Sequence, residues 1–349
     1  MKKEHILIIR FSALGDVAMA VPVVYSLAMT YPHVRITVLS RGFARPFFDD
    51  LAPNVSFMEA DIKGEYRGIK GLNALYRRLV AKKPTAVADF HGVLRSTYLR
   101  MRFNMERFRV EHINKHRSGK RALTSSSDKR MVQQPTSFDN YAEVLARLGY
   151  PVKLQFSSIF GNEGGDLSLL PAAIGKRNEG EQWIGIAPFA AHKGKVYPPE
   201  MMERVIDLIE ENNPHCRIFL FGRGRDESHT FPEWCARHPH CIFVGEHLDT
   251  MRQELVLMSH LDVMVSMDSA NMHMASLTGT PVVSVWGATH PYAGFMGWHQ
   301  SEDNAVQLDL PCRPCSIFGN KPCRRGDFAC MNGIKPEQIY DKINRLLSH

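Results

Sequence analysis

The sequence predicts an α/β fold of two doubly wound parallel sheets. Short apolar runs that predict buried strands alternate with helical stretches in both halves of the chain, a pattern typical of βαβ units. The alternation stops in a polar region at residues 151–180 and then restarts, and 349 residues are long for one α/β domain but comfortable for two. Hydrophobic residues make up 44% of the chain, which is enough to bury two ordinary cores.

The first half of the chain carries five predicted strands and the helices between them. The strands are expected at residues 6–9, 36–39, 55–58, 86–89 and 109–112. The helices are expected at residues 22–31, 43–51, 69–81, 93–103 and 138–148, with Pro22 in a first turn, where its missing N–H costs nothing. Residues 114–136 are polar, basic and too long for a plain connection, which predicts a mobile functional loop or a partly disordered segment.

The pattern after residue 180 predicts a second sheet. Its strands are expected at residues 183–187, 217–221, 242–244, 263–266 and 282–286, and its helices at 199–212, 229–238, 250–259, 270–278 and 336–347. We therefore expect an N-terminal domain at 1–165, a C-terminal domain at 181–335 and a closing helix at 336–349. Two such domains facing each other across a cleft suit nucleotide-linked substrates, because each offers strand ends and helix N-termini to one half of a reaction.

The charge of the chain indicates an anionic partner. The formal net charge is +7, and basic residues are in excess between Arg95 and Arg130. Nucleic acid, a phosphorylated glycolipid or a membrane surface would suit this charge, while a solvated basic face is the alternative. No apolar run approaches the ~20 residues that span a bilayer, and the N-terminus leads straight into a strand without a signal-peptide pattern. The sequence therefore predicts a cytoplasmic protein.

The first predicted strand leads into residues 10–16, RFSALGD. In an open α/β sheet, ligands bind at the carboxyl ends of the strands. Asp16 is therefore placed where chemistry is done, and it is a candidate general base. The alternative is that Asp16 only caps the turn before the following helix.

Residues 263–275, VMVSMDSANMHMA, predict a strand, a turn and a helix with the features of an anion site. Ser269 and Asn271 suit the helix start. The free N–H groups of the first turn and the helix dipole suit a diphosphate, to which His273 could add a hydrogen bond. Packing against Trp286 is the alternative role of this histidine. Asp268 is expected to hold a sugar hydroxyl or to orient the loop.

Two further loops at strand ends carry charged candidates. Lys195 lies in a glycine-containing loop before an apolar pair and a proline, and it could neutralise a leaving diphosphate. The alternative for this lysine is a solvated surface charge. For Lys193, in the same loop, both roles stay open. The loop after Gly222 contains Asp226 and Glu227, which could bind ribose hydroxyls, although its Gly-x-Gly lacks the third glycine of a dinucleotide site.

Together these segments resemble glycosyltransferase family 9, the ADP-heptose:lipopolysaccharide heptosyltransferases and their relatives. The resemblance covers most of the chain and rests on RFSALGD with Pro22, on DFHG at 89–92 with Arg95 and Ser96, on Lys195 before Val-Tyr-Pro, and on DSANMH at 268–273. It implies a GT-B fold, in which two Rossmann-like doubly wound domains bind the acceptor and the nucleotide-sugar respectively. It also implies an inverting sugar transfer that requires no metal or other cofactor.

The resemblance implies a role for each candidate residue. Asp16 would be the catalytic base. The donor, expected to be an ADP-sugar, would be held by Lys195, Asp226 or Glu227, Asp268, Ser269, Ala270, Asn271 and His273. A phosphorylated glycolipid such as a lipid A–Kdo core would be met by Ser12, His91, Arg95 and Lys120, at the inner face of the inner membrane with peripheral contact to anionic lipid. The chain departs from the family pattern at Ser269-Ala270 and after Gly222, so another nucleotide-activated sugar stays open.

Two other functions compete with this interpretation. A GT-B-like nucleotide-sugar epimerase or hydrolase would isomerise or release the sugar without an acceptor. A nucleic-acid-binding protein would use the basic residues 95–130, but only Tyr98, Phe103 and Phe108 offer stacking aromatics there, and no helix-turn-helix or RNP motif is present. We therefore expect no nucleic acid partner.

Four of the seven cysteines form a cluster, Cys312-x2-Cys315-x7-Cys323-x6-Cys330. Such a cluster could bind zinc in a structural site, but the spacing of six residues in the second pair departs from the common pattern. Stable disulfides are not expected in a cytoplasmic protein. We expect the cluster to order the long loop 310–333 and to take no part in catalysis.

Overall fold

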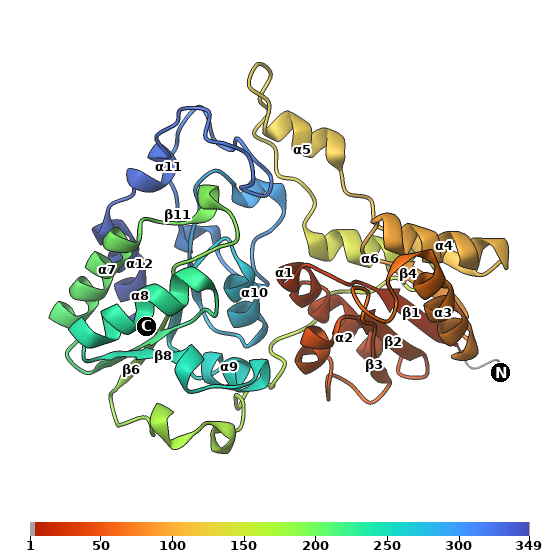
Figure 1. The fold of residues 1–349 in the computed structure, drawn as a ribbon, viewed down its shortest axis with the longest axis horizontal. Coiled ribbons are helices and arrows are strands. Elements are labelled where there is room, and N and C mark those ends of the chain that lie inside the picture. The colour runs from red at the N-terminus through yellow and green to blue at the C-terminus, as the bar shows by residue number, and fades with distance from the viewer. Residues whose placement is uncertain (1–3, 349) are drawn as a thin grey trace. The chain divides into compact units, whose positions relative to one another are not determined.

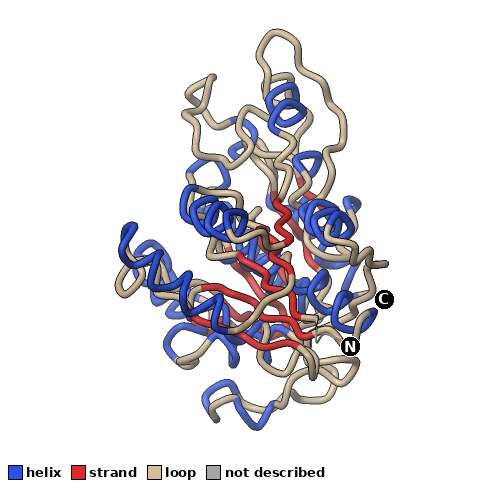
Figure 2. Tube along the Cα trace, turned by 90° about the vertical axis from the view of Figure 1, so that its right-hand side faces the viewer, coloured by secondary structure: helices blue, strands red, loops and turns tan. Residues whose placement is uncertain are grey.

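The computed structural model describes residues 4–348, which form two compact units. Unit 1 consists of Met1–Lys115 and Pro135–Ile159, and unit 2 consists of His116–Gln134 and Phe160–His349. Each unit contains one parallel sheet accompanied by helices, which confirms the predicted α/β class (Figure 1). The tube in Figure 2 shows the strands in red with helices in blue on either side of them.

The sheet of unit 1 has five strands in the order β3-β2-β1-β4-β5, all parallel. They are β1 (His5–Ile9), β2 (Arg35–Ser40), β3 (Val55–Glu59), β4 (Ala86–Asp89) and β5 (Arg109–His112). All five residues of β1 are buried, as expected for a central strand covered on both faces. The register pairs Ile9 with Leu39 and with Asp89, so the segments that follow β1 and β4 emerge side by side.

The helices of unit 1 are α1 (Leu14–Ala18), α2 (Val21–Thr30), α3 (Gly68–Ala81), α4 (Leu94–Met105) and α6 (Ser137–Arg147). Pro22 lies in the first turn of α2, as predicted. A short loop is expected between the first strand and the helix at residues 22–31, but the segment around Asp16 forms the short helix α1. The helix predicted at residues 43–51 is also wrong: the chain forms a 3₁₀ helix over Gly42–Phe47, in which Pro46 has no N–H to donate.

The sheet of unit 2 has six parallel strands in the order β11-β10-β9-β6-β7-β8. They are β6 (Gln182–Ala187), β7 (Cys216–Leu220), β8 (Cys241–Phe243), β9 (Val263–Met267), β10 (Val282–Val285) and β11 (Ala305–Val306). The register pairs Ile186 with Leu220, Ala187 with Ser266, and Met267 with Val285. The loops after β6, β7, β9 and β10 therefore leave the same edge of the sheet.

The helices that follow in unit 2 are α7 (Pro199–Asn212), α8 (Arg225–Arg237), α9 (Met251–Met258), α10 (Ala270–Leu277), α11 (Ala329–Asn332) and α12 (Pro336–Leu347). Helix α8 begins before residue 229, where the sequence predicts its start, because Gly224 serves as its N-cap and two acids favour its first turn. Buried aliphatic residues of β6, β7 and β9 and of helices α7 and α12 form a large core cluster. Among residues 4–348, no helix is long and apolar enough to cross a bilayer.

Residues 116–134, here called the basic arm, belong to unit 2. They are drawn in yellow in Figure 1. The alternative of partial disorder is wrong for these residues, because the arm contains helix α5 (Arg117–Leu123) and buries Leu123. The alternative of a mobile functional loop stays a prediction. The ammonium group of Lys129 donates to the carbonyls of Pro311, Arg313 and Pro314 at 2.7–3.2 Å. These long-range contacts anchor a segment whose own composition indicates no order.

Candidate functional site

The segment after β1 holds an ion pair between Arg10, which directly follows the strand, and Asp16, which lies in α1. Arg10 is buried, and its Nη2 lies 2.6 Å from Oδ2 of Asp16, whose side chain is 32% exposed. The Arg10 Nη1 also donates to the carbonyl of Phe90 at 2.8 Å, and the Tyr141 hydroxyl donates to the backbone carbonyl of Asp16 at 3.2 Å. The loops after two neighbouring strands thus fix one carboxylate at the carboxyl edge of the sheet.

Asp16 also caps its own helix. The N–H of Ala13 donates to Oδ2 of Asp16 at 3.2 Å, and Asp16 occupies the first turn of α1. The capping role considered from the sequence is therefore present, and it coexists with the ion pair. A carboxylate that is held in place and partly open to solvent can still accept a proton from a bound hydroxyl.

The loop after β4 places His91 beside this pair. Asp89 is fully buried, and its Oδ1 accepts hydrogen bonds from the N–H groups of His91 and Gly92 at 2.9 Å. Burial of the ring, together with the charges of Arg10 and Lys115, lowers the pKa of His91 to about 3, so the imidazole is neutral near pH 7. The Phe11 N–H donates to Nδ1 at 3.4 Å, which assigns the hydrogen to Nε2.

The other predicted acceptor residues of unit 1 lie on the same side of the sheet edge. Ser12 is half-buried in the segment between β1 and α1. Arg95 is exposed in the first turn of α4, and the neighbouring Ser96 caps that helix by accepting the N–H of Val93 at 3.0 Å. Asp16, His91, Ser12 and Arg95 therefore all lie on the loops after β1 and β4 or at the helix starts that follow them.

In unit 2, Lys195 pairs with Asp268. The Lys195 Nζ lies 2.8 Å from Oδ2 of Asp268, and the side chains are 15% and 4% exposed. Lys195 ends the 3₁₀ turn Lys193–Lys195 after β6, and Asp268 directly follows β9. This contact adds a role to the two predicted for Asp268, which stay predictions: its carboxylate positions the ammonium group of Lys195. Lys193, in contrast, is exposed.

Helix α10 begins directly after Asp268. Ser269 is its N-cap and makes no side-chain capping bond to the helix, so Ala270 and Asn271 present backbone N–H groups at the start of an eight-residue helix. His273 lies further along in the helix and is buried. Four of the predicted donor residues are thus consecutive at one helix start, and Lys195 is bound to the first of them.

Asp226 and Glu227 occupy the first turn of α8 but differ in direction. A Cβ added to Gly224 would lie 2.2 Å from Oε2 of Glu227, which shows that this carboxylate folds back over its own loop. Asp226 is exposed and lines an open groove with Lys193 and His229. Of the two candidates, Asp226 lines this groove and Glu227 does not.

Lys120 lies in unit 2, on α5, and not with the other predicted acceptor residues. Its Nζ is 4.3 Å from the centre of the Phe295 ring, a cation–π contact. The prediction from sequence placed it in a stretch of chain continuous with Arg95, but Lys115 is the last residue of unit 1 before the basic arm.

Arg10 received no role from its residue type or spacing, although it is the side chain that positions Asp16. The signal that could have found it is a charged residue directly after a fully apolar strand. Such a side chain is buried with the strand and needs a charged or carbonyl partner. Tyr141, on α6, carries no comparable signal, because its partner is 125 residues away.

Two parallel-sheet units, each with charged groups at the carboxyl edge of its sheet, define a class of protein with the GT-B fold. The chain matches the model of glycosyltransferase family 9 (heptosyltransferase) over residues 72–322, and it belongs to this family. The structure of E. coli ADP-heptose LPS heptosyltransferase II superposes with a TM-score of 0.70 at 17% identity, covering 99% of this chain and 98% of that one. This match confirms the predicted fold, and the family match confirms the resemblance.

Curated relatives agree with the family. The lipopolysaccharide core heptosyltransferase OpsX of Haemophilus influenzae is 22% identical over 292 residues, which cover 82% of this chain and 80% of that protein. Lipooligosaccharide heptosyltransferase 2 of Campylobacter jejuni is 29% identical over 85 residues, which are 24% of this chain. The chain spans about a quarter, 26%, of the length of this Campylobacter relative.

Proposed function

We propose that this protein transfers heptose, or a similar sugar, from a nucleotide diphosphate donor to an acceptor of the lipopolysaccharide core or lipid A type. The observation that carries the proposal is the partly exposed carboxylate of Asp16, held by buried Arg10 at the strand end where ligands bind in such sheets. Family membership and the ADP-heptose named for the E. coli structure support the choice of donor.

The proposed reaction is a direct displacement with inversion. Asp16 takes the proton of an acceptor hydroxyl, and the oxygen attacks the anomeric carbon of the donor sugar. The bond from that carbon to the diphosphate breaks, and the nucleoside diphosphate leaves with the electron pair. Neutral His91, with its hydrogen on Nε2, can donate a hydrogen bond to the acceptor but cannot act as an acid.

Leaving-group stabilisation is assigned to unit 2. Lys195 supplies a positive charge whose position is fixed by Asp268, and the N–H groups at the start of α10 supply further donors to a diphosphate. Asp226 is assigned to the ribose hydroxyls. With a fixed lysine and a helix N-terminus in place, the departure of the diphosphate needs no metal ion.

Peripheral membrane contact is proposed through α4. Leu94, Met101 and Met105 are exposed and, at spacings of seven and four, share one side of the helix. Arg95 and Arg102 lie on the same helix and would meet anionic headgroups. Binding to vesicles with anionic lipid at low salt should fall in a Leu94→Glu/Met105→Glu variant. The variant Leu169→Glu, which changes an exposed leucine of unit 2, is the matched control.

The first experiment is a thermal shift of the purified protein with nucleoside diphosphates and nucleotide-sugars, each with and without EDTA. ADP and an ADP-sugar should raise the Tm, and the size of that rise should not change with EDTA. A rise in Tm with a different nucleotide would show that the donor carries that nucleotide instead of ADP. No rise with any nucleotide would contradict the proposal.

Turnover then tests the reaction itself. With the selected donor and a deacylated lipopolysaccharide core as acceptor, NMR of the product should show an inverted anomeric carbon. Sugar release or isomerisation without acceptor, at a rate equal to that with acceptor, would instead support the epimerase or hydrolase alternative.

A further inference from the structure

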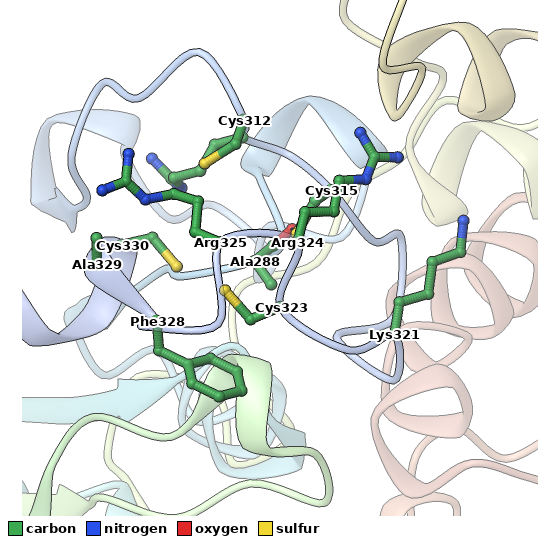
Figure 3. Close-up of a pocket in the computed structure, with 11 residues that line it drawn as sticks. Ala288, Cys312, Cys315, Lys321, Cys323, Arg324, Arg325, Phe328, Ala329 and Cys330 are labelled. Atoms are coloured by element: carbon green, nitrogen blue, oxygen red, sulfur yellow. The ribbon is translucent and has the colours of Figure 1, made fainter.

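The four clustered cysteines, from distant points of the loop 310–333, line a single small pocket (Figure 3). We call residues 310–333 the cysteine loop. Cys315 and Cys330 are buried, Cys312 and Cys323 are half-buried, and all four are free thiols. The sulfur atoms of Cys312, Cys323 and Cys330 point into the same space in Figure 3. In the sequence, the six residues between Cys323 and Cys330 depart from the common zinc-site spacing. In the fold this spacing does not keep the two apart, because Cys330 lies on helix α11 and lines the same pocket.

A tight turn follows Cys323. The N–H of Gly326 donates to the carbonyl of Cys323 at 3.2 Å, and Gly326 has φ +81°, a conformation that favours glycine. The turn leads the chain into α11, which carries Cys330, so that two cysteines seven residues apart line the same pocket.

The pocket is lined by several arginines, whose positive charges an anionic group would balance. Arg313 is buried, and its guanidinium donates to neutral oxygens, the carbonyls of Gly287, Leu308 and Thr289 and the side chain of Gln307. Arg324 and Arg325 line the pocket as well. A divalent ion with four thiolates carries a net charge of −2, which would compensate these cations in a place where isolated charges are costly.

We propose that Cys312, Cys315, Cys323 and Cys330 bind one thiophilic metal ion, zinc by its preference for four sulfurs in a tetrahedron. Each metal–sulfur bond forms as its thiol releases a proton to solvent. Among the described residues, no three candidate ligands are already arranged to hold an ion. Binding therefore draws the sulfurs together from their positions in the pocket, and no step of sugar transfer involves the ion.

The cysteine loop makes hydrogen bonds to two other parts of unit 2. An ion that orders the loop would therefore also hold these two parts in place. On one side, Lys129 of the basic arm donates to three loop carbonyls, and Arg324 donates to the carbonyl of Thr124 at 3.0 Å. On the other side, the N–H of Cys315 donates to the carbonyl of Ala288 at 3.0 Å, and the N–H of Ala288 donates to the carbonyl of Gly194 at 2.8 Å. The loop thus links the basic arm to the turn that carries Lys195.

The test begins with metal analysis of the full chain purified without chelator or affinity metal. We expect about one equivalent of zinc per chain. Serine substitution at any of the four cysteines should lower this content at least severalfold, whereas Cys235→Ser, a half-buried cysteine outside the loop, should leave it unchanged. Iron at the same stoichiometry, lost with the same variants, would uphold the site and change only the ion. Absence of metal from the wild-type chain would overturn the proposal.

A second measurement does not depend on whether the serine variants fold. Wild-type protein in which cobalt replaces the native ion should show the thiolate-to-cobalt charge-transfer and tetrahedral d–d bands of a sulfur site. A cobalt spectrum without thiolate bands would overturn the assignment of ligands. Trypsin should cut the basic arm faster in metal-depleted protein than in reloaded protein, and equal cutting would refute the bracing role.

Discussion

In unit 1 the more exposed member of the candidate ion pair is the carboxylate, whereas in unit 2 it is the cation. Asp16 is 32% exposed and is held by buried Arg10; Lys195 is 15% exposed and is held by nearly inaccessible Asp268. Each buried partner is in turn fixed by the backbone, since Arg10 donates to the Phe90 carbonyl and the N–H of Asp268 donates to the Val285 carbonyl. In both units a buried partner holds the more accessible charge, which is the group assigned to the reaction in the proposed function.

Each ion pair therefore combines a proposed reactive group, the more exposed side chain, with a positioning group, the buried side chain. Removing the accessible member should affect turnover most, because that group meets the reacting atoms. Removing the buried member should affect stability as well, because its partner and its backbone contact are both lost.

The largest effect is expected for Asp16→Asn. Turnover should fall by about 10²–10⁴-fold, the range for loss of a general base, while nucleotide binding stays unchanged. Steady-state kinetics and the ADP-induced thermal shift measure the two quantities. The variant Asp49→Asn removes another exposed carboxylate of unit 1 that pairs with an arginine, and it should retain full turnover. Equal loss in both variants would deny Asp16 its role.

The next effect is expected for Lys195→Met, which should lower turnover by about 10²–10³-fold through loss of leaving-group stabilisation. Because the substitution leaves Asp268 buried without its cation, the measurement is repeated in an Asp268→Asn background, where that penalty is absent. Lys193→Met is the control from the same turn, with an exposed side chain. If Lys193→Met lowers turnover as much as Lys195→Met does, the pairing with Asp268 does not select the reactive lysine.

A stability effect is expected for Arg10→Met. The Phe90 carbonyl loses its buried donor and Asp16 loses its cation, so the free energy of unfolding should fall by about 1–3 kcal/mol. Urea unfolding checks this, with Arg45→Met as the control, since Arg45 pairs at the surface with Asp49 at 3.8 Å. An unchanged free energy of unfolding in Arg10→Met would contradict the expectation that the buried member of the ion pair contributes to stability.

The smallest effect is expected in the pH profile of His91→Gln. Because the folded-state pKa of His91 is about 3 and its ordinary value is 6.5, the ring does not change charge in the folded protein above pH 5. Its contribution to stability is complete above pH 6.5 and is lost as the pH falls toward 3. Turnover of wild type and His91→Gln should therefore share the same acidic limb between pH 5 and 8, and a shifted limb would make His91 the titrating group.

Much of the fold could be predicted because strands in parallel sheets are apolar along their whole length. Strands β1, β4 and β9 are buried along their whole length, and β6 is buried except at its first residue, Gln182; their positions follow directly from the sequence. The basic arm could not be predicted. Its order comes from partners about 180–200 residues away in the sequence, such as the carbonyls that receive Lys129 and the Arg324 that reaches Thr124.

The candidate site was predicted as a set of residues but not as a set of contacts. Position after a strand was enough to single out Asp16, Lys195 and Asp268. The pairing of Arg10 with Asp16 depends on how α1 turns the carboxylate back, and the pairing of Lys195 with Asp268 depends on β6 and β9 being neighbours in the sheet. Contacts of this kind depend on the tertiary structure and cannot be predicted from local sequence patterns.

The place of the basic arm in the chain has a consequence for synthesis on the ribosome. Lys129 leaves the exit tunnel long before Pro311, which follows it by 182 residues. At about 5–20 residues per second, the arm waits roughly 10–40 s for the carbonyls that anchor it. During that interval a cationic segment is without its final partners, while unit 1, whose last residue is 159, completes its own sheet and helices. A nascent chain stalled before residue 311 should therefore expose the arm to protease even after unit 1 has folded.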